Sequence, residues 1–72
     1  MRTPLDGCPY PPPCSHYGGR VRCTAPATHW YLDSEGALNP GGYTCEAHGR
    51  ATVAEYAARL GETWTLRPIA AA

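Results

Sequence analysis

Four cysteines and a Cys-x-x-His pair lie in a chain of only 72 residues, and this combination restricts the fold more than any other feature of the sequence. Such a length allows one small domain, whose hydrophobic core alone would give only marginal stability. Additional cross-links are therefore expected. Disulfides and a metal ion are the two options, and the redox compartment decides between them.

The N-terminal sequence MRTPLDGCPYPPPC contains a single arginine but no apolar run of the kind that a signal peptide needs, and no later segment resembles a membrane span. We therefore expect a cytoplasmic protein with no membrane partner. A reducing cytoplasm keeps cysteines as thiols unless a metal binds them. One structural Zn²⁺ ion is thus predicted in place of a disulfide framework.

The formal net charge is zero, and the six positively charged residues are all arginines. Strong sequence-independent binding to nucleic acid needs many phosphate contacts, so it is not expected here. Arg20 and Arg22 precede Cys23, and Arg50 follows His48 closely. These three arginines make a weak nucleic-acid-binding zinc module the alternative function.

Proline dominates the N-terminal segment. Pro9 and Pro11 to Pro13 surround Tyr10, which predicts that residues 1–13 form an extended, polyproline-like arm without backbone hydrogen bonds of its own. A single zinc-binding domain is predicted over residues 14–69. Residues 70–72 are expected to form a frayed tail.

Two short strands joined by a hairpin loop are predicted in the middle of the chain. Residues 27–32 are rich in aromatic and β-branched side chains, and they are bounded by turn formers. The glycines and Asn39-Pro40 predict a loop over residues 33–42, and residues 43–45 then form the second strand. Residues 63–67 alternate and add a possible third strand.

A helix is predicted over residues 52–60. Thr52 and Glu55 have the spacing of a capping box, and Gly61 is the expected C-terminal cap. One apolar stripe follows the helical period: Val53, Tyr56, Ala57 and Leu60. The predicted fold class is therefore a small, zinc-stabilised α+β domain with a β-hairpin and one short helix.

Cys45 and His48 are the first candidate zinc ligands. They are three residues apart, at the end of a predicted strand, and ligands with this spacing can reach one ion across a tight turn. Cys23 is the favoured upstream ligand, because the turn Cys-Thr-Ala-Pro directly precedes the first predicted strand.

Cys14 is the preferred fourth ligand, since the glycine-containing loop between Cys14 and Cys23 can fold back. Cys8 is its rival, and His16 is an alternative for either position. The predicted site is thus Cys14, Cys23, Cys45 and His48, with Cys8 and His16 as alternative ligands.

The segments CTAPATHWYL, YTCEAH and AEYAARLGETW resemble a group of short zinc-binding proteins of phages and actinobacteria. The resemblance covers about residues 14–67. It implies a treble-clef or zinc-ribbon-like fold with one zinc ion held by Cys14, Cys23, Cys45 and His48. Members of this group mostly lack an assigned function. For a phage-encoded chain, it also implies the host cytoplasm and a protein partner from the host or the phage.

Enzymatic activity is not expected. Three thiolates make zinc a poor Lewis acid, and the zinc-hydrolase pattern H-E-x-x-H and the zinc-deaminase pattern are both absent. A chain of 72 residues also leaves little room for a pocket that would hold a small-molecule substrate. No catalytic residue is therefore assigned, and Glu46 is interpreted as a solvated carboxylate.

Protein–protein interaction is the favoured function. The chain has two tryptophans and five tyrosines, more aromatic side chains than a hairpin and a short helix can cover. Some rings should remain at the surface, where aromatic residues and arginine are favoured binding anchors. Tyr31, Tyr43, Arg20 and Arg22 are the predicted partner-binding residues.

Overall fold

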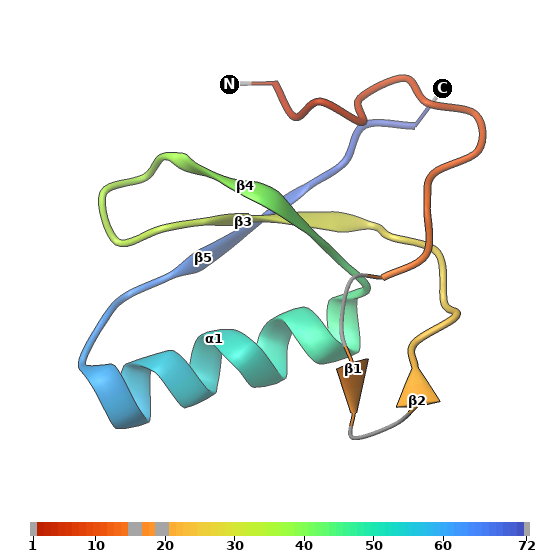
Figure 1. The fold of residues 1–72 in the computed structure, drawn as a ribbon. Helices are drawn as coiled ribbons and strands as arrows, with labels where there is room; N and C mark the ends of the chain where they lie inside the picture. Colours follow the sequence, from red (N-terminus) through yellow and green to blue (C-terminus); the bar gives the residue numbers. More distant parts are fainter. Residues whose placement is uncertain (1, 15–16, 19–20, 72) are drawn as a thin grey trace.

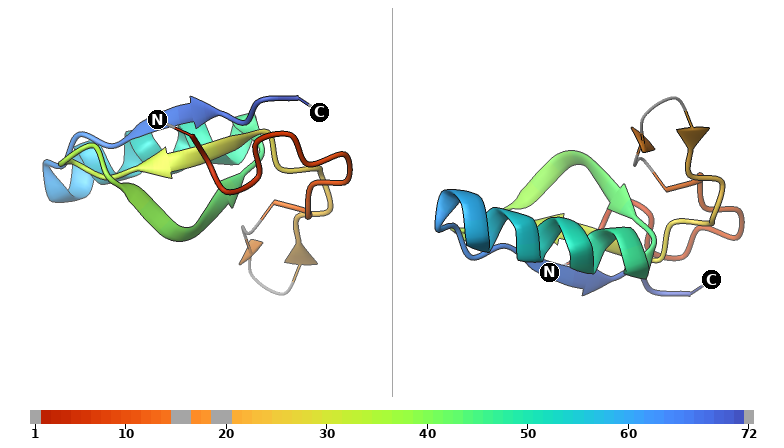
Figure 2. Two further views of the ribbon diagram at one scale, coloured as in Figure 1. Left: turned by 90° about the horizontal axis from the view of Figure 1, so that it is seen from above. Right: turned by 90° about the horizontal axis from the view of Figure 1, so that it is seen from below.

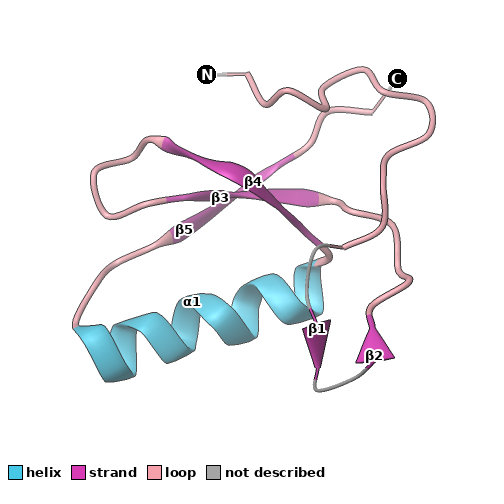
Figure 3. Cartoon of the chain, viewed as in Figure 1, coloured by secondary structure: helices cyan, strands magenta, loops and turns pink. Residues whose placement is uncertain are grey.

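One helix packs against a three-stranded antiparallel sheet, and a two-stranded hairpin lies near the start of that helix (Figure 1, Figure 3). A computed structural model describes residues 2–14, 17–18 and 21–71, without the side chains of residues 17–18 and 21–22. The elements are β1 (Tyr17–Gly18), β2 (Val21–Arg22), β3 (His29–Leu32), β4 (Leu38–Thr44), α1 (Glu46–Leu60) and β5 (Thr65–Pro68). The predicted small α+β fold is confirmed.

Strand β3 is the centre of the larger sheet, which has the order β4-β3-β5. Trp30 on β3 pairs with Tyr43 on β4 and with Arg67 on β5. The C-terminal segment therefore supplies the third strand that its alternating sequence predicts. Helix α1 covers one side of this sheet (Figure 1).

Strand β4 is longer than predicted and contains an irregularity. Trp30 pairs with Tyr43 while Leu32 pairs with Leu38, so β4 has additional residues between these two points and curves away from β3 (Figure 2). The indole Nε1 of Trp30 donates a hydrogen bond to the Asn39 backbone oxygen at 2.8 Å. Local turn signals predicted a loop here, but this long-range bond holds the segment on the sheet.

Helix α1 begins at Glu46, and the prediction that it begins at residue 52 is wrong. Cys45 is the N-cap residue, and its side chain makes no capping hydrogen bond. Thr52 lies inside the helix, so the Thr52–Glu55 spacing is not a capping box. The end is predicted correctly: Gly61 has φ of 66°, and its N–H donates to the Tyr56 oxygen.

The N-terminal segment runs along the side of the sheet opposite α1 (Figure 1, Figure 2). The expectation of an arm without its own backbone hydrogen bonds is corrected for residues 3–8, because the N–H of Asp6 donates to the oxygen of Thr3 at 3.1 Å and the N–H of Cys8 to that of Leu5 at 3.0 Å. The Asp6 carboxylate stabilises this turn, because it accepts a hydrogen bond from the Thr3 N–H.

The two ends of the chain are joined by hydrogen bonds. One carboxylate oxygen of Asp6 accepts bonds from the Thr3 hydroxyl at 2.6 Å and from the Ala70 N–H at 3.1 Å. The N–H of Gly7 donates to the Ala70 oxygen at 3.0 Å. Ala70 is therefore fixed, contrary to the expectation that the tail frays from this residue.

The core is small. Among the described residues, the buried apolar side chains are Cys14, Ala27 and Trp30, and the buried polar ones are Thr3 and Thr44. Aromatic rings among the described residues also contact one another, in the pairs Trp30–Tyr43, Tyr31–Trp64 and Tyr56–Trp64. So few buried side chains agree with the expectation that a domain of this length needs an additional cross-link.

Candidate metal centre

Antiparallel pairing of two proline-containing segments positions Cys14. An isolated bridge joins Pro13 to Pro26, and since neither proline has an N–H group, their neighbours form the hydrogen bonds. These bonds run from Cys14 N to Ala25 O at 2.7 Å and from Ala27 N to Pro12 O at 3.0 Å. The short hairpin of β1 and β2 connects the two segments and returns the chain to Cys23.

Cys45 and His48 are positioned by the junction of β4 and α1. Cys45 follows the last residue of β4, and His48 lies in the first turn of the helix. Gly49 is buried, and a Cβ atom there would lie 2.8 Å from Thr44 Cγ2 and 3.0 Å from the methyl groups of Leu66. Only glycine therefore allows this turn to approach both strands so closely.

One ligand atom from each of Cys14, Cys23, Cys45 and His48 lies within 4.8 Å of all the others. The Sγ atoms of Cys23 and Cys45 are 4.0 Å apart. His48 Nδ1 lies 3.4 Å from Cys45 Sγ and 3.8 Å from Cys14 Sγ. A tetrahedral zinc site with ordinary bond lengths has edges of about 3.8 Å between two sulfurs and about 3.5 Å between sulfur and nitrogen. The four residues therefore fit one metal ion.

The four ligands differ in exposure. Cys14 is fully buried, and its Sγ lies 3.5 Å from the hydroxyl oxygen of Thr44, which is also fully buried. Cys23, Cys45 and His48 are half-buried. The cluster thus has one side packed against the core and one side that faces the solvent.

The pKa of the Cys23 thiol is raised above its ordinary value. A backbone hydrogen bond from Ala25 favours the thiolate, but burial and the neighbouring sulfurs of Cys14 and Cys45 outweigh it. Closely spaced thiolates repel one another, and a divalent cation reverses this effect because it stabilises the deprotonated forms. Binding of a divalent cation by this cluster would therefore release protons from the thiols.

Of the two alternative ligands, Cys8 alone lies in the described part of the chain. Cys8 is half-buried and is not one of the four clustered residues. His16 lies outside the described residues. His29, the third histidine of the chain, is also outside the four-residue cluster, and its Nδ1 atom lies 2.8 Å from the Thr28 hydroxyl oxygen.

Two of the four predicted partner-binding residues, Tyr31 and Tyr43, have described side chains. Tyr31 is half-buried with its ring edge-on to Trp64, and Tyr43 is half-buried against Trp30. Arg20 lies outside the described residues, and the side chain of Arg22 is not described. The grouping of all four residues therefore stays a prediction.

Two exposed side chains are not among the predicted partner-binding residues. Tyr10 is 88% exposed and Leu60 is 61% exposed. The flanking prolines were the available signal for Tyr10, because they prevent this segment from folding over its own side chain.

Glu46 is half-exposed and forms an ion pair with Arg50 at 2.7 Å.

No helix in the described part of the chain has the length and hydrophobicity that a membrane-spanning segment requires. Comparisons with protein-family models, with curated proteins and with solved structures give no match. The four-residue cluster is therefore the feature on which a functional assignment must rest.

Proposed function

We propose that this protein is a small structural-zinc module that mediates protein–protein interaction. The observation that carries the zinc assignment is the spacing of the four ligand atoms, which lie within 4.8 Å of one another. Three sulfurs and one imidazole nitrogen are a common donor set for structural zinc. Such a site supplies folding free energy directly, which suits a domain with so small a core.

A treble-clef or zinc-ribbon-like arrangement is part of this proposal. Cys14 and Cys23 flank the β1–β2 hairpin, while Cys45 and His48 come from a strand end and the first turn of a helix. Each pair of ligands therefore comes from a compact turn, and the metal joins the two. This arrangement supports the relationship to short phage and actinobacterial zinc proteins, and with it a host-cytoplasmic protein partner.

A structural role is favoured over catalysis because four protein ligands complete a tetrahedron and leave no position for a substrate. Glu46, the carboxylate nearest in sequence, is paired with Arg50. The alternative function in nucleic-acid binding receives little support from the described arginines, since Arg50 and Arg59 each pair with a glutamate on the same helix. Protein interaction is supported by the exposed Tyr10 and Leu60.

The proposal is tested by native mass spectrometry of the reduced protein and of single Cys→Ser variants. We expect one zinc ion in the wild type, its loss in Cys14→Ser and Cys45→Ser, and its retention in Cys8→Ser. Cys8→Ser is the matched control, because it makes the same chemical change outside the cluster. A metal-free wild type, or a Cys8→Ser variant that loses the metal, would contradict the assignment.

A further inference from the structure

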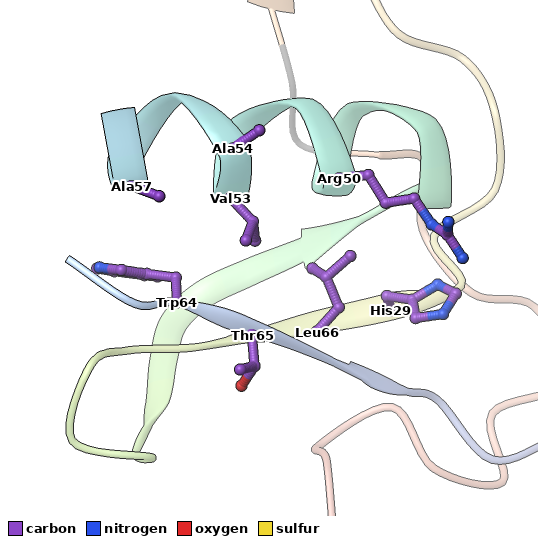
Figure 4. Close-up of a pocket in the computed structure, with 8 residues that line it drawn as sticks. All are labelled: His29, Arg50, Val53, Ala54, Ala57, Trp64, Thr65 and Leu66. Carbon is purple, nitrogen blue, oxygen red and sulfur yellow. The ribbon is translucent and has the colours of Figure 1, made fainter. Parts of the chain in front are cut away.

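An open apolar groove runs between α1 and β5 (Figure 4). Its volume is about 480 Å³, and Val53 and Ala57 of the helix face Trp64 and Leu66 across it. At one end, the guanidinium of Arg50 lies beside the imidazole of His29 (Figure 4). The groove is thus apolar along most of its length and basic at one end.

The groove lies beside a sheet edge. Among the described residues, β5 pairs only with β3, so the other side of Thr65–Pro68 has no neighbouring strand. Just beyond this stretch, the outward N–H and C=O of Ala70 are bonded to Asp6 and Gly7 of the N-terminal segment. The Ile69 N–H donates to the Thr28 oxygen at 2.9 Å. Because antiparallel bonding alternates along a strand, the backbone N–H and C=O of Leu66 point away from β3. Leu66 therefore offers an outward N–H and C=O to another strand, and Pro68, the other outward residue of β5, offers its C=O alone.

A strand that adds to this edge must meet a defined sequence requirement. Its side chains on the α1 side recur at every second position. In an antiparallel strand, the residue opposite Pro68 lies near the basic end of the groove, because Pro68 pairs with His29. The two following residues on the same side lie opposite Leu66 and Trp64. The matching pattern is therefore acidic, any residue, apolar, any residue, apolar.

The chain itself contains this pattern at residues 62–66, Glu-Thr-Trp-Thr-Leu. With Thr65 opposite Thr65 of a second copy, Glu62 of each copy lies opposite Pro68 of the other. Trp64 of each copy then lies opposite Leu66 of the other. This register is symmetric about a twofold axis. The β5 edge of each copy is therefore paired, and the groove of each copy is filled, by the same contacts.

We propose that two copies of this protein associate through their β5 edges in this register. Trp64 and Leu66 of one copy pack in the groove of the other. Glu62 Oε1 accepts a hydrogen bond from Trp64 Nε1 of its own copy at 2.9 Å, and its second carboxylate oxygen meets Arg50 and His29 of the other copy. Arg50 already contacts Glu46 through one guanidinium nitrogen, and its side chain is 75% exposed, which leaves further donors for a second carboxylate. The inference names a partner for the protein-interaction role proposed above and rests on that role.

The test begins with the oligomeric state of the zinc-loaded wild type, measured by sedimentation velocity. An interface this short is expected to be weak, so the concentration is raised to about 1 mM. We expect a reversible monomer–dimer equilibrium. A wild type that stays monomeric at the highest concentration overturns the proposal.

A charge exchange tests the register. In Glu62→Arg and in Arg50→Glu, each homodimer places like charges opposite one another, and we expect dimerisation to weaken at least about tenfold. An equimolar mixture of the two variants restores opposite charges at both contacts, so heterodimers are expected. Arg59→Glu is the matched control on the same helix outside this groove, and it should dimerise like the wild type.

The outcomes separate this inference from the zinc assignment. Zinc content is measured on every sample, so a dimer without zinc contradicts the proposed structural-zinc role alone. Zinc-loaded Glu62→Arg and Arg50→Glu variants that do not associate when mixed overturn the β5 register. Dimerisation that is unchanged in both single variants also overturns it.

Discussion

His48 Nδ1 lies 3.4 Å from the Sγ atom of Cys45, although His48 is in a helix and Cys45 precedes it. The first turn of α1 therefore directs an imidazole back towards the end of β4. Cys14 and Cys23 approach the same point from a different part of the chain. A metal at this point would join segments that few other buried contacts hold together.

Removal of zinc is expected to unfold the domain. Structural zinc contributes on the order of 10 kcal/mol to folding, which is comparable to the total stability of a small domain. Circular dichroism during titration with a chelator should therefore show helix loss in step with metal loss. Restoration of the spectrum by added zinc is the control for irreversible damage, and a helix signal that survives complete metal removal would contradict the prediction.

Gly49→Ala is expected to destabilise the zinc-loaded protein by about 1–3 kcal/mol, because overpacking costs this much. The added Cβ would lie 2.8 Å from Thr44 Cγ2. Alanine has the better intrinsic helix propensity by about 1 kcal/mol, so a gain in stability would show that the helix can shift. Urea unfolding measures the change, and Ala58→Gly at an exposed position of α1 reports propensity alone.

The helix and its ligand pair show how far the sequence could predict the structure. The Cys45–His48 spacing and the Gly61 cap are local features, and both are found as predicted. The helix start was missed because Cys45 makes no side-chain cap and because Gly49 disfavours a helix locally. Glycine is needed at position 49 because the helix there lies against Thr44 and Leu66, and this contact is visible only in the three-dimensional structure.

The upstream half of the cluster depends on long-range pairing. The glycine-containing loop between Cys14 and Cys23 favours Cys14 but does not exclude Cys8, and the sequence reasoning therefore kept Cys8 as an alternative. Pairing of residues 12–14 with residues 25–27 decides which cysteine approaches Cys23. The hydrogen bonds that pair these segments are made by the residues next to the prolines. The sequence does not reveal this pairing, because a proline normally argues against a strand.

Asp6→Asn is expected to lower the free energy of unfolding at pH 7. Hydrogen bonds from the Thr3 hydroxyl and the Ala70 N–H lower the pKa of Asp6 below 3.8. A lowered pKa in the folded state gives stability that is present above the unfolded pKa and is lost as the pH falls through the folded pKa. The difference between variant and wild type should thus be equal at pH 7 and pH 5 and should shrink as the pH falls below about 4. Urea unfolding over this range tests this, and a difference that stays constant below about pH 4 would show that the pKa is not lowered.

Trp30→Phe is expected to destabilise the protein by about 1–2 kcal/mol, since it leaves a partly buried carbonyl without its donor. The lost bond is the one from Trp30 Nε1 to the Asn39 oxygen, 2.8 Å long. Hydrogen exchange of the amides in residues 38–42 should accelerate more than that of residues 65–68. Equal acceleration in β4 and β5 would indicate a general loss of packing instead. Trp64→Phe removes the other indole as a comparison.

The unequal burial of the four clustered residues sets an order of chemical attack. Cys14 is fully buried, whereas Cys23 and Cys45 are half-buried with their sulfurs 4.0 Å apart. Alkylating or oxidising reagents should therefore reach Cys23 and Cys45 before Cys14. In the zinc-loaded domain, ligand exchange would begin at the half-buried Cys23 and Cys45. Cys14 would be the last sulfur to leave the metal.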